Sequence, residues 1–272
     1  MGRTGEDRQD VVESLKRIGF EPYLEREGIA LYHAEELDIL PHLAADSVDA
    51  LIADPPYCSG AATLGGKSAD PVQKYWKDGN ACGRPTFGGD HLDQRSFRFW
   101  CTLWIRLACR ATKAGGYSLV FSDWRQLPSM TDSVQAGGFT WRGIVPWDKG
   151  RGARAPHTGY FRHQAEYVTW GTKGPCLKAL GRGPFEGVIS APIRRAEKLH
   201  LTGKSVEGMR TLVSAVPPDG LILDPFAGAS TTLLAACLEG RRAIGIEREE
   251  AYCEISAERL ERVIGEGLPA AA

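Results

Sequence analysis

The stretch Val48-Asp49-Ala50-Leu51-Ile52-Ala53-Asp54-Pro55-Pro56-Tyr57 contains an apolar run that ends at an acidic residue and two prolines. Such a run predicts a buried parallel strand, because these strands are covered on both faces and proline cannot continue a hydrogen-bonded ladder. The strand places Asp54 at the carboxyl edge of a sheet, where open α/β sheets bind their ligands. A strand that simply ends in a proline turn with a capping aspartate would give the same pattern.

Asp54, Pro55, Pro56 and Tyr57 together suit chemistry on the exocyclic amine of a nucleobase. The lone pair of that amine is delocalised into the ring, so a catalyst has to accept its two N–H hydrogens while the nitrogen rehybridises. The Asp54 carboxylate can accept one hydrogen, and the carbonyl of Pro55, on a rigid turn, can accept the other. Tyr57 offers a flat face on which a flipped base can stack.

A second unit of strand, tight turn, helix and strand lies near the end of the chain. Residues 221–223 predict a buried strand that leads into Asp224-Pro225-Phe226-Ala227-Gly228-Ala229-Ser230. A helix over 231–238 follows, and then a strand over 243–246 that ends at Glu247. Small residues in the turn allow close backbone approach, and an acid about 20 residues later can bind both ribose hydroxyls. This pattern is typical of sites for NAD, FAD or S-adenosylmethionine.

The remaining segments alternate between helical and extended patterns, which predicts a doubly wound α/β fold. Further helices are expected over 11–18, from after Glu36 to Leu43, and over 97–112, 125–136, 206–215 and 251–263. Further strands are expected over 29–33, 116–121, 139–147 and 165–170. The strands over 139–147 and 165–170 are expected to form an antiparallel pair at one edge of the sheet.

Composition is that of an ordinary globular protein, with 272 residues, 43% hydrophobic and 25% charged. The net charge of -1 predicts no general affinity for nucleic acid, so any basic surface has to be local. No apolar run is long enough to span a membrane, and the polar start does not resemble a signal peptide. The cysteines form no Cys-x-x-Cys pair and the histidines are scattered, so we expect a cytoplasmic protein without a metal site.

Two segments with little regular pattern could contact a ligand. Residues 58–96 are rich in glycine, with basic and aromatic residues interleaved, which suits either nucleic acid or a lid over a small-molecule pocket. The region 149–192 begins with the densest basic run of the chain. A solvated loop is one interpretation of that run and contact with phosphates is the other. The candidate phosphate-binding residues are Lys149, Arg151, Arg154 and Arg162.

The two strand-end motifs together resemble the amino-methylating DNA methyltransferases, which transfer a methyl group from S-adenosylmethionine to adenine N6 or cytosine N4. The Asp54 motif precedes the Asp224 motif, as in the circularly permuted beta class. The resemblance implies a Rossmann-like α/β domain over residues 29–264, with a seven-stranded mixed sheet and helices on both faces. An extension over 1–28, a flexible tail over 265–272 and candidate DNA-recognition loops at 58–96 and 149–192 complete the expected organisation.

The resemblance also assigns roles to individual positions. Asp54, Pro55, Pro56 and Tyr57 match the catalytic motif, and Glu247 matches the ribose-binding acid. Asp224, Pro225, Phe226, Ala227 and Gly228 match the cofactor motif. His200, Thr202 and Lys204 match a segment that holds the methionine end of the cofactor, although Leu201 and Ser205 replace its two prolines. Glu35 stands where the family often has an aspartate near the adenine of the cofactor, and Ala229-Ser230 replaces the usual Ser-Gly.

The expected function is therefore site-specific methylation of a flipped base in double-stranded DNA. Adenine N6 is favoured because the motif begins with Asp, whereas the cytosine N4 group resembles Ser-Pro-Pro-Tyr. Alternatives are cytosine N4 methylation, a non-catalytic module that binds cofactor and DNA, or methylation of RNA or a protein amide. Likeness to the family further suggests a homodimer and a cognate restriction enzyme.

Overall fold

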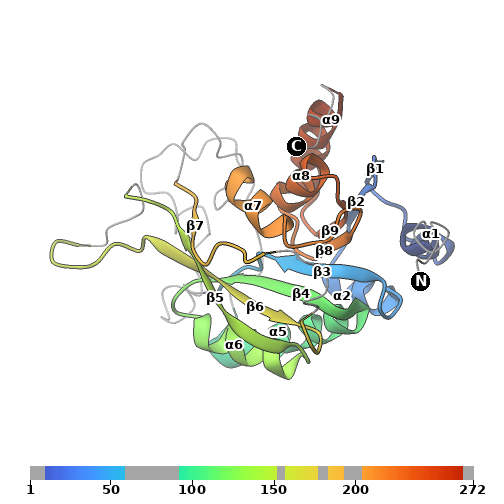
Figure 1. Ribbon diagram of the computed structural model, residues 1–272. Coiled ribbons are helices and arrows are strands. Elements are labelled where there is room, and N and C mark those ends of the chain that lie inside the picture. Colours follow the sequence, from blue (N-terminus) through green and yellow to red (C-terminus); the bar gives the residue numbers. More distant parts are fainter. Residues whose placement is uncertain (1–9, 59–91, 152–156, 177–182, 193–203, 266–272) are drawn as a thin grey trace.

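The computed structural model describes residues 10–58, 92–151, 157–176, 183–192 and 204–265 (Figure 1). Strands in these ranges form one mixed sheet in the order β1-β2-β9-β8-β3-β4-β6-β5-β7. The strands are β1 (Leu24–Arg26), β2 (Ile29–His33), β3 (Val48–Ala53), β4 (Thr112–Ser122), β5 (Thr140–Asp148), β6 (Ala165–Thr172), β7 (Ile189–Ser190), β8 (Leu221–Asp224) and β9 (Arg242–Glu247). The strand expected between residues 29 and 33 is thus confirmed at both ends.

The centre of the sheet is parallel and one side of it is antiparallel. β2, β9, β8, β3 and β4 are parallel neighbours, whereas β6 pairs antiparallel with both β4 and β5. The predicted antiparallel pair is confirmed, but β7 pairs with β5 and lies outside it. Because β3 and β8 are parallel neighbours, with Leu51 opposite Leu223, the tips that carry Asp54 and Asp224 lie side by side at one sheet edge.

The predicted fold class is confirmed, although the sheet in the described residues has nine strands and not seven. The two shortest strands are β1, with three residues, and β7, with two. Segments this short carry no readable apolar periodicity, because a side-chain alternation needs about four residues to be recognised. β1 lies in the predicted extension 1–28 and pairs with β2 of the predicted domain.

Helices cover the two faces of the sheet (Figure 1). They are α1 (Asp10–Arg17), α2 (Glu36–Ile39), the short 3₁₀ helix η2 (Leu40–His42), α5 (Gln94–Ala111), α6 (Leu127–Ala136), α7 (Val206–Val213), α8 (Thr231–Leu238) and α9 (Glu250–Gly265). α2, α5 and α6 lie on one face, and α7, α8 and α9 lie on the other. The helix expected over 231–238 is confirmed at both ends.

Each face of the sheet has its own hydrophobic core, and neighbouring residues of one strand enter different cores. In β3, Leu51 packs with α5 and α6, whereas Ile52 packs with α7 and α8. A strand buried on both faces is apolar at its buried positions on either side. This explains why β3 is apolar without a break from Ala50 to Ala53, after the half-buried Asp49.

Capping side chains set the starts of two helices. The Asp93 carboxylate accepts hydrogen bonds from the backbone N–H groups of Arg95 and Ser96, so α5 begins at Gln94, earlier than the predicted residue 97. Ser205 caps α7 by accepting from the N–H of Gly208 at 3.1 Å. This cap fixes the chain immediately after Lys204.

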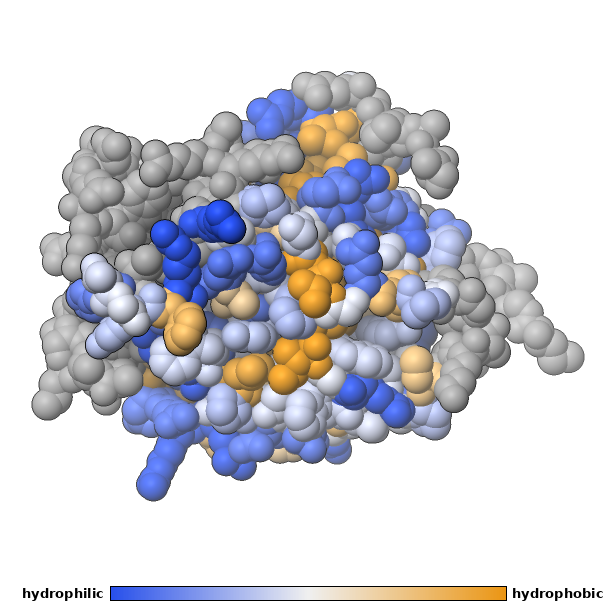
Figure 2. Space-filling view, turned by 60° about the vertical axis from the view of Figure 1, so that its left-hand side comes forward, coloured by the Kyte–Doolittle hydropathy of each residue, from blue (hydrophilic) through white to orange (hydrophobic). Residues whose placement is uncertain are grey.

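The surface drawn in Figure 2 carries small hydrophobic patches separated by hydrophilic residues. Within the described ranges, no helix is both long and apolar enough to cross a membrane. The described residues end with α9 at Gly265, so the rest of the predicted tail lies outside them. Most of the predicted loop 58–96 and part of the region 149–192 also lie outside them.

Candidate functional site

Asp54 lies at the tip of β3, and both of its carboxylate oxygens have a donor. The Tyr57 hydroxyl donates to Oδ1 at 2.7 Å, and the Lys204 ammonium donates to Oδ2 at 2.6 Å. Pro55 and Pro56 end the strand and turn the chain, which brings Tyr57 back over the carboxylate. The structure therefore brings together the predicted catalytic residues Asp54 and Tyr57. It also adds Lys204, which the sequence had suggested for the cofactor.

Lys204 is the most enclosed member of the ion pairs around Asp54, with a side chain only 6% exposed. Besides Asp54, its ammonium lies 2.9 Å from Oε2 of Glu166 and donates to the Tyr57 hydroxyl at 3.2 Å. The ring of Phe121 lies below it, with the centroid 4.8 Å from Nζ. An aromatic face attracts a cation, so the site holds Lys204 by both charge and shape.

Glu166, on β6, is a site residue that the predicted site did not include. It pairs with Lys204 through Oε2 and accepts from Lys149 through Oε1 at 3.0 Å. One signal in the sequence could have found it. A carboxylate in the otherwise apolar strand over 165–170 needs a cationic partner if it is buried, because an isolated buried charge is very costly.

Burial and charge act in opposite directions on these groups. Burial raises the pKa of Asp54, and Glu166 adds to this, whereas Lys204 opposes it. Burial also raises the pKa of Tyr57 well above its usual value, so the hydroxyl stays protonated as a donor. Burial likewise disfavours ionisation of Glu166, but Lys204 and Lys149 outweigh it and lower the pKa of this carboxyl group. The site is thus arranged around hydrogen-bond acceptance by Asp54.

The turn after β8 forms the second half of the site. Asp224 is 2% exposed and its Oδ1 accepts from the N–H of Phe226 at 3.0 Å. Burial raises the pKa of Asp224 to about 7. Gly228 has a φ of +52°, the left-handed conformation that glycine adopts without strain. The predicted tight turn is therefore present at the tip of β8, next to the tip of β3.

Glu247, at the end of β9, ties this turn to its neighbouring strand. Its Oε2 accepts from the N–H of Gly228 and its Oε1 accepts from the N–H of Glu249, both at 2.8 Å. Burial raises the pKa of Glu247. Each carboxylate oxygen can accept a further hydrogen bond, so the carboxylate retains capacity for the hydroxyl groups of a ribose.

An aromatic cluster borders the turn. The Phe226 ring meets Trp100 and Trp104 edge to face, with centroids 5.4 and 5.0 Å away. The indole N–H of Trp100 donates to Glu36 at 2.7 Å. Glu36 is buried, whereas the predicted residue Glu35 is exposed and lies 3.8 Å from Arg248. The cluster is an apolar wall with one buried acid beside the turn.

The other predicted residues are placed only in part. His200, Thr202 and Arg154 lie outside the described residues. Arg151 and Arg162 are exposed in the region 149–192, as a phosphate contact requires. The ammonium of Lys149 is paired with Glu166, so it lies beside the Asp54 site.

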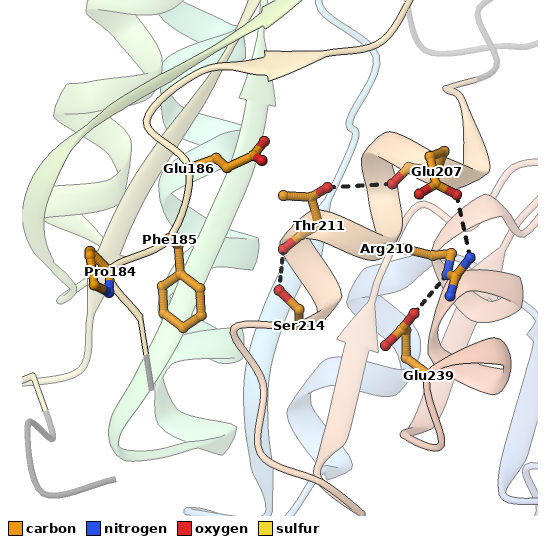
Figure 3. Close-up of a pocket in the computed structure, with 8 residues that line it drawn as sticks. All are labelled: Pro184, Phe185, Glu186, Glu207, Arg210, Thr211, Ser214 and Glu239. Atoms are coloured by element: carbon orange, nitrogen blue, oxygen red, sulfur yellow. Dashed lines mark hydrogen bonds and ion pairs between the residues drawn. The ribbon is translucent and has the colours of Figure 1, made fainter. Parts of the chain in front are cut away.

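A separate groove of about 370 Å³ lies away from the strand tips (Figure 3). Its walls are the segment beginning at Pro184, helix α7 and the end of α8. Figure 3 shows Arg210 between Glu207 and Glu239, to which it is paired. Glu239 follows α8 and precedes β9, so it lies near the amino edge of the parallel strands, opposite Asp54.

Known proteins match most of this chain. A profile of the DNA methylase family matches residues 185–258, which include Lys204, the Asp224 turn and Glu247. The Type II methyltransferase M2.DpnII of Streptococcus pneumoniae is 26% identical over 259 residues, covering 88% of this chain and 92% of the relative. The putative methylase YubD of Escherichia coli K12 is 27% identical over 230 residues, covering 83% of this chain and 87% of the relative.

Solved structures share the fold. The M1.HpyAVI complex with SAM has a TM-score of 0.61 at 22% identity and covers 85% of this chain and 98% of that one. The cytosine-N4-specific PvuII DNA methyltransferase has a TM-score of 0.64 at 17% identity and covers 89% of both chains. With the paired strand tips, these comparisons lead to one conclusion: residues 185–258 match the DNA methylase family, the chain is similar to Type II methyltransferases over most of its length, and it has the fold of the DNA methyltransferases.

Proposed function

We propose that this enzyme methylates adenine N6 in double-stranded DNA, using S-adenosylmethionine and a base flipped out of the duplex. The observation that carries the proposal is the adjacency of two strand tips. One holds the Asp54 acceptor and the other holds the nucleoside-type turn that begins at Asp224. A methyl donor and an extruded base bound at these tips would meet within one site, which is what direct transfer requires.

Asp54 acts mainly as an acceptor and orienter in this mechanism. Its carboxylate accepts one amine hydrogen, and the Pro55 carbonyl accepts the other, so the nitrogen lone pair points toward the donor. The amine becomes acidic only as the new bond forms, so Asp54 does not have to be a strong base. The Tyr57 ring stacks on the base in this mechanism. Stacking requires a shift of the hydrogen bond that the Tyr57 hydroxyl donates to Asp54.

The proposed cofactor site uses the second half of the candidate site, around the turn after β8. S-adenosylmethionine supplies an activated methyl group on a sulfonium. Glu247 binds the ribose hydroxyls, the Phe226 cluster covers the adenine, and the turn through Pro225, Ala227 and Gly228 lies against the cofactor backbone. Glu35, His200 and Thr202 are further proposed contacts. Lys204 contacts Asp54 in this structure, so its proposed role includes orienting that carboxylate.

Adenine is favoured over cytosine because the motif starts with an aspartate. Cytosine N4 is the second candidate, and the similar fold of a cytosine-N4-specific enzyme favours keeping it. Methylated DNA digested to nucleosides and identified by mass distinguishes N6-methyladenine from N4-methylcytosine. Detection of N4-methylcytosine alone would overturn the adenine proposal and leave the family membership intact.

DNA binding is proposed to use the basic residues of the region 149–192. Arg151, Arg154 and Arg162 would contact phosphates, which fix the position on DNA without reading its sequence, whereas the ammonium of Lys149 is paired with Glu166. Several curated relatives are named as Type II methyltransferases, so a cognate restriction enzyme is a proposed partner, and a homodimer is the proposed assembly. Competition between duplex DNA and RNA separates DNA methylation from the RNA alternative.

The decisive experiment is the Asp54→Ala variant. We expect it to lose methyl transfer to DNA by at least about 100-fold while it still binds S-adenosylmethionine, because only the acceptor is removed. Transfer of labelled methyl groups and calorimetric cofactor binding measure the two properties. Unchanged transfer in the variant would refute the assignment of Asp54. Absence of transfer in the unmodified enzyme on DNA from a methylation-deficient host would favour the non-catalytic module.

A further inference from the structure

Four charged side chains form one connected network beside Asp54. The ammonium of Lys204 lies 2.6 Å from Asp54 and 2.9 Å from Glu166, and the ammonium of Lys149 lies 3.0 Å from the other oxygen of Glu166. The four groups come from the tip of β3, the second residue before α7, the strand β6 and the residue after β5. We call this set the Lys204 network.

The Lys204 network is neutral overall, with two carboxylates and two ammonium groups. Neutrality matters because the side chains are largely buried, with 6% exposure at Lys204, 16% at Glu166, 23% at Lys149 and 24% at Asp54. Removing one partner from a buried set leaves a charge without compensation. Each member therefore controls the electrostatic state of the others.

Lys204 is shared between two carboxylates, and this sharing decides how strongly it holds Asp54. If Glu166 were absent, the ammonium would face Asp54 alone and saturate its charge. A carboxylate that is fully paired with a cation is a weaker acceptor for another hydrogen bond. With Glu166 on its other side, Lys204 can fix the direction of the Asp54 carboxylate while leaving it able to accept an amine hydrogen.

We propose that Glu166 is a positioning residue for methyl transfer, which acts on Asp54 through Lys204 and is itself balanced by Lys149. The inference rests on the proposed function, because it assumes that Asp54 accepts a hydrogen from the target amine. Glu166 touches neither the base nor the cofactor in this scheme. It sets the position and the charge of the group that holds Asp54.

Other charged or titratable groups also face Asp54 and have to be considered. The Tyr57 hydroxyl donates to it, and Asp224 on the adjacent strand tip is close enough for like charges to interact. The charge of Asp123, at the tip of β4, contributes to the raised pKa of Tyr57. None of these groups changes in the variants below, so a difference between the variants reports on the Lys204 network.

Two substitutions in the network should move the ionisation of Asp54 in opposite directions. Glu166→Gln removes a negative charge beside Asp54, so its pKa falls, whereas Lys149→Met leaves the charge of Glu166 uncompensated, so the pKa of Asp54 rises. We expect shifts of about one pH unit each way. The measurement is a pH titration of the Asp54 carboxyl carbon by NMR in aspartate-labelled protein, with Asp54→Asn to assign the signal.

The same variants should separate catalysis from binding. At saturating DNA and cofactor, Glu166→Gln should lower kcat by roughly 10- to 100-fold and leave both KM values within about threefold, because a displaced acceptor costs rate more than affinity. The acid limb of kcat should move in the same directions as the NMR titrations. Glu166→Asp, which keeps the negative charge, should recover part of the lost kcat. It should also return the acid limb of kcat toward its pH in the unmodified enzyme.

Glu239→Gln is the matched control. Glu239 is 22% exposed and is paired with Arg210 at 2.6 Å, but it lies at the opposite edge of the sheet. The Glu239→Gln substitution should lower the free energy of unfolding without changing the pKa of Asp54 or the acid limb of kcat. If Glu166→Gln does not fold, Lys149→Met provides the test alone through the expected rise in the pKa of Asp54, since Lys149 is less enclosed than Glu166.

Equal titrations of Asp54 in the unmodified enzyme and both network variants would overturn the inference, as would shifts in the same direction. These outcomes are distinct from failure of the proposed function. In that case the unmodified enzyme would transfer no methyl group to DNA, while its Asp54 titration could still be measured.

Discussion

At the scale of single residues, Asp224 illustrates a conflict between stability and function. Its carboxyl group is buried at the end of β8, and burial raises its pKa to about 7 although Thr232 and the N–H of Phe226 partly oppose this. The pKa is therefore higher in the folded chain than in the unfolded chain. Between about pH 4 and pH 7 the unfolded chain is ionised at this position and the folded chain is not, so folding is increasingly disfavoured as the pH rises.

Asp224→Asn should therefore stabilise the protein, because an amide keeps the acceptor for Phe226 and has no charge to bury. We expect the free energy of unfolding to rise by roughly 2 to 4 kcal/mol at pH 8 and by less at pH 5. Urea unfolding at both pH values measures this difference. A gain that is the same at both would show that the carboxyl group ionises normally. Calorimetry should show weaker cofactor binding by the same variant.

At the scale of elements, the turn from β8 into α8 contains a residue in a strained conformation. Ser230 has a φ of +56° and a ψ of +39°, the left-handed region that glycine adopts more readily than serine. Its side chain is buried, and among the described residues its hydroxyl has no hydrogen-bond partner. Both features cost folding free energy at the start of α8.

Ser230→Gly should raise the free energy of unfolding by about 1 kcal/mol, because glycine adopts this conformation without a clash. Ser230→Ala is the matched control, since it removes the hydroxyl but keeps the strain. Denaturant unfolding of the three proteins separates the two contributions. If glycine gives no advantage over alanine, backbone strain at this turn is not significant.

At the scale of the whole molecule, the first described helix belongs to the main core. Leu15 of α1 is fully buried in the core that α5 and α6 form with the sheet, and Phe20 packs against it. Lys16 pairs with Glu25 of β1 at 2.8 Å. The part of the predicted extension that the structure describes is therefore packed onto the domain.

Leu15→Ala should lower the free energy of unfolding of the whole domain by about 2 to 5 kcal/mol, as expected for a large cavity in a core. The slope of the free energy of unfolding against urea concentration should stay the same if α1 unfolds together with the sheet. Ile18→Ala is the control, because Ile18 is 53% exposed and its loss should cost less than about 0.5 kcal/mol. A separate early transition in the Leu15 variant would show that α1 unfolds independently.

The sequence by itself determined the features that depend on neighbouring residues. Apolar runs that end in Asp54 and Asp224 predicted buried strands with polar tips, and proline and glycine fixed the turns that follow. The order of these two motifs predicted the family and the permuted fold. Such features are local, because a few consecutive side chains set the strand, its burial and its end.

Tertiary structure alone decided which distant groups meet. Lys204 lies 150 positions from Asp54 in the chain, and only the packing of the segment before α7 beside β3 brings its ammonium to that carboxylate. The same packing placed Glu166 in the site, made Glu36 and not Glu35 the buried acid, and added the short strands β1 and β7. A local pattern does not encode these contacts, because they depend on how separate elements are positioned when the apolar surfaces of the sheet and helices are buried together.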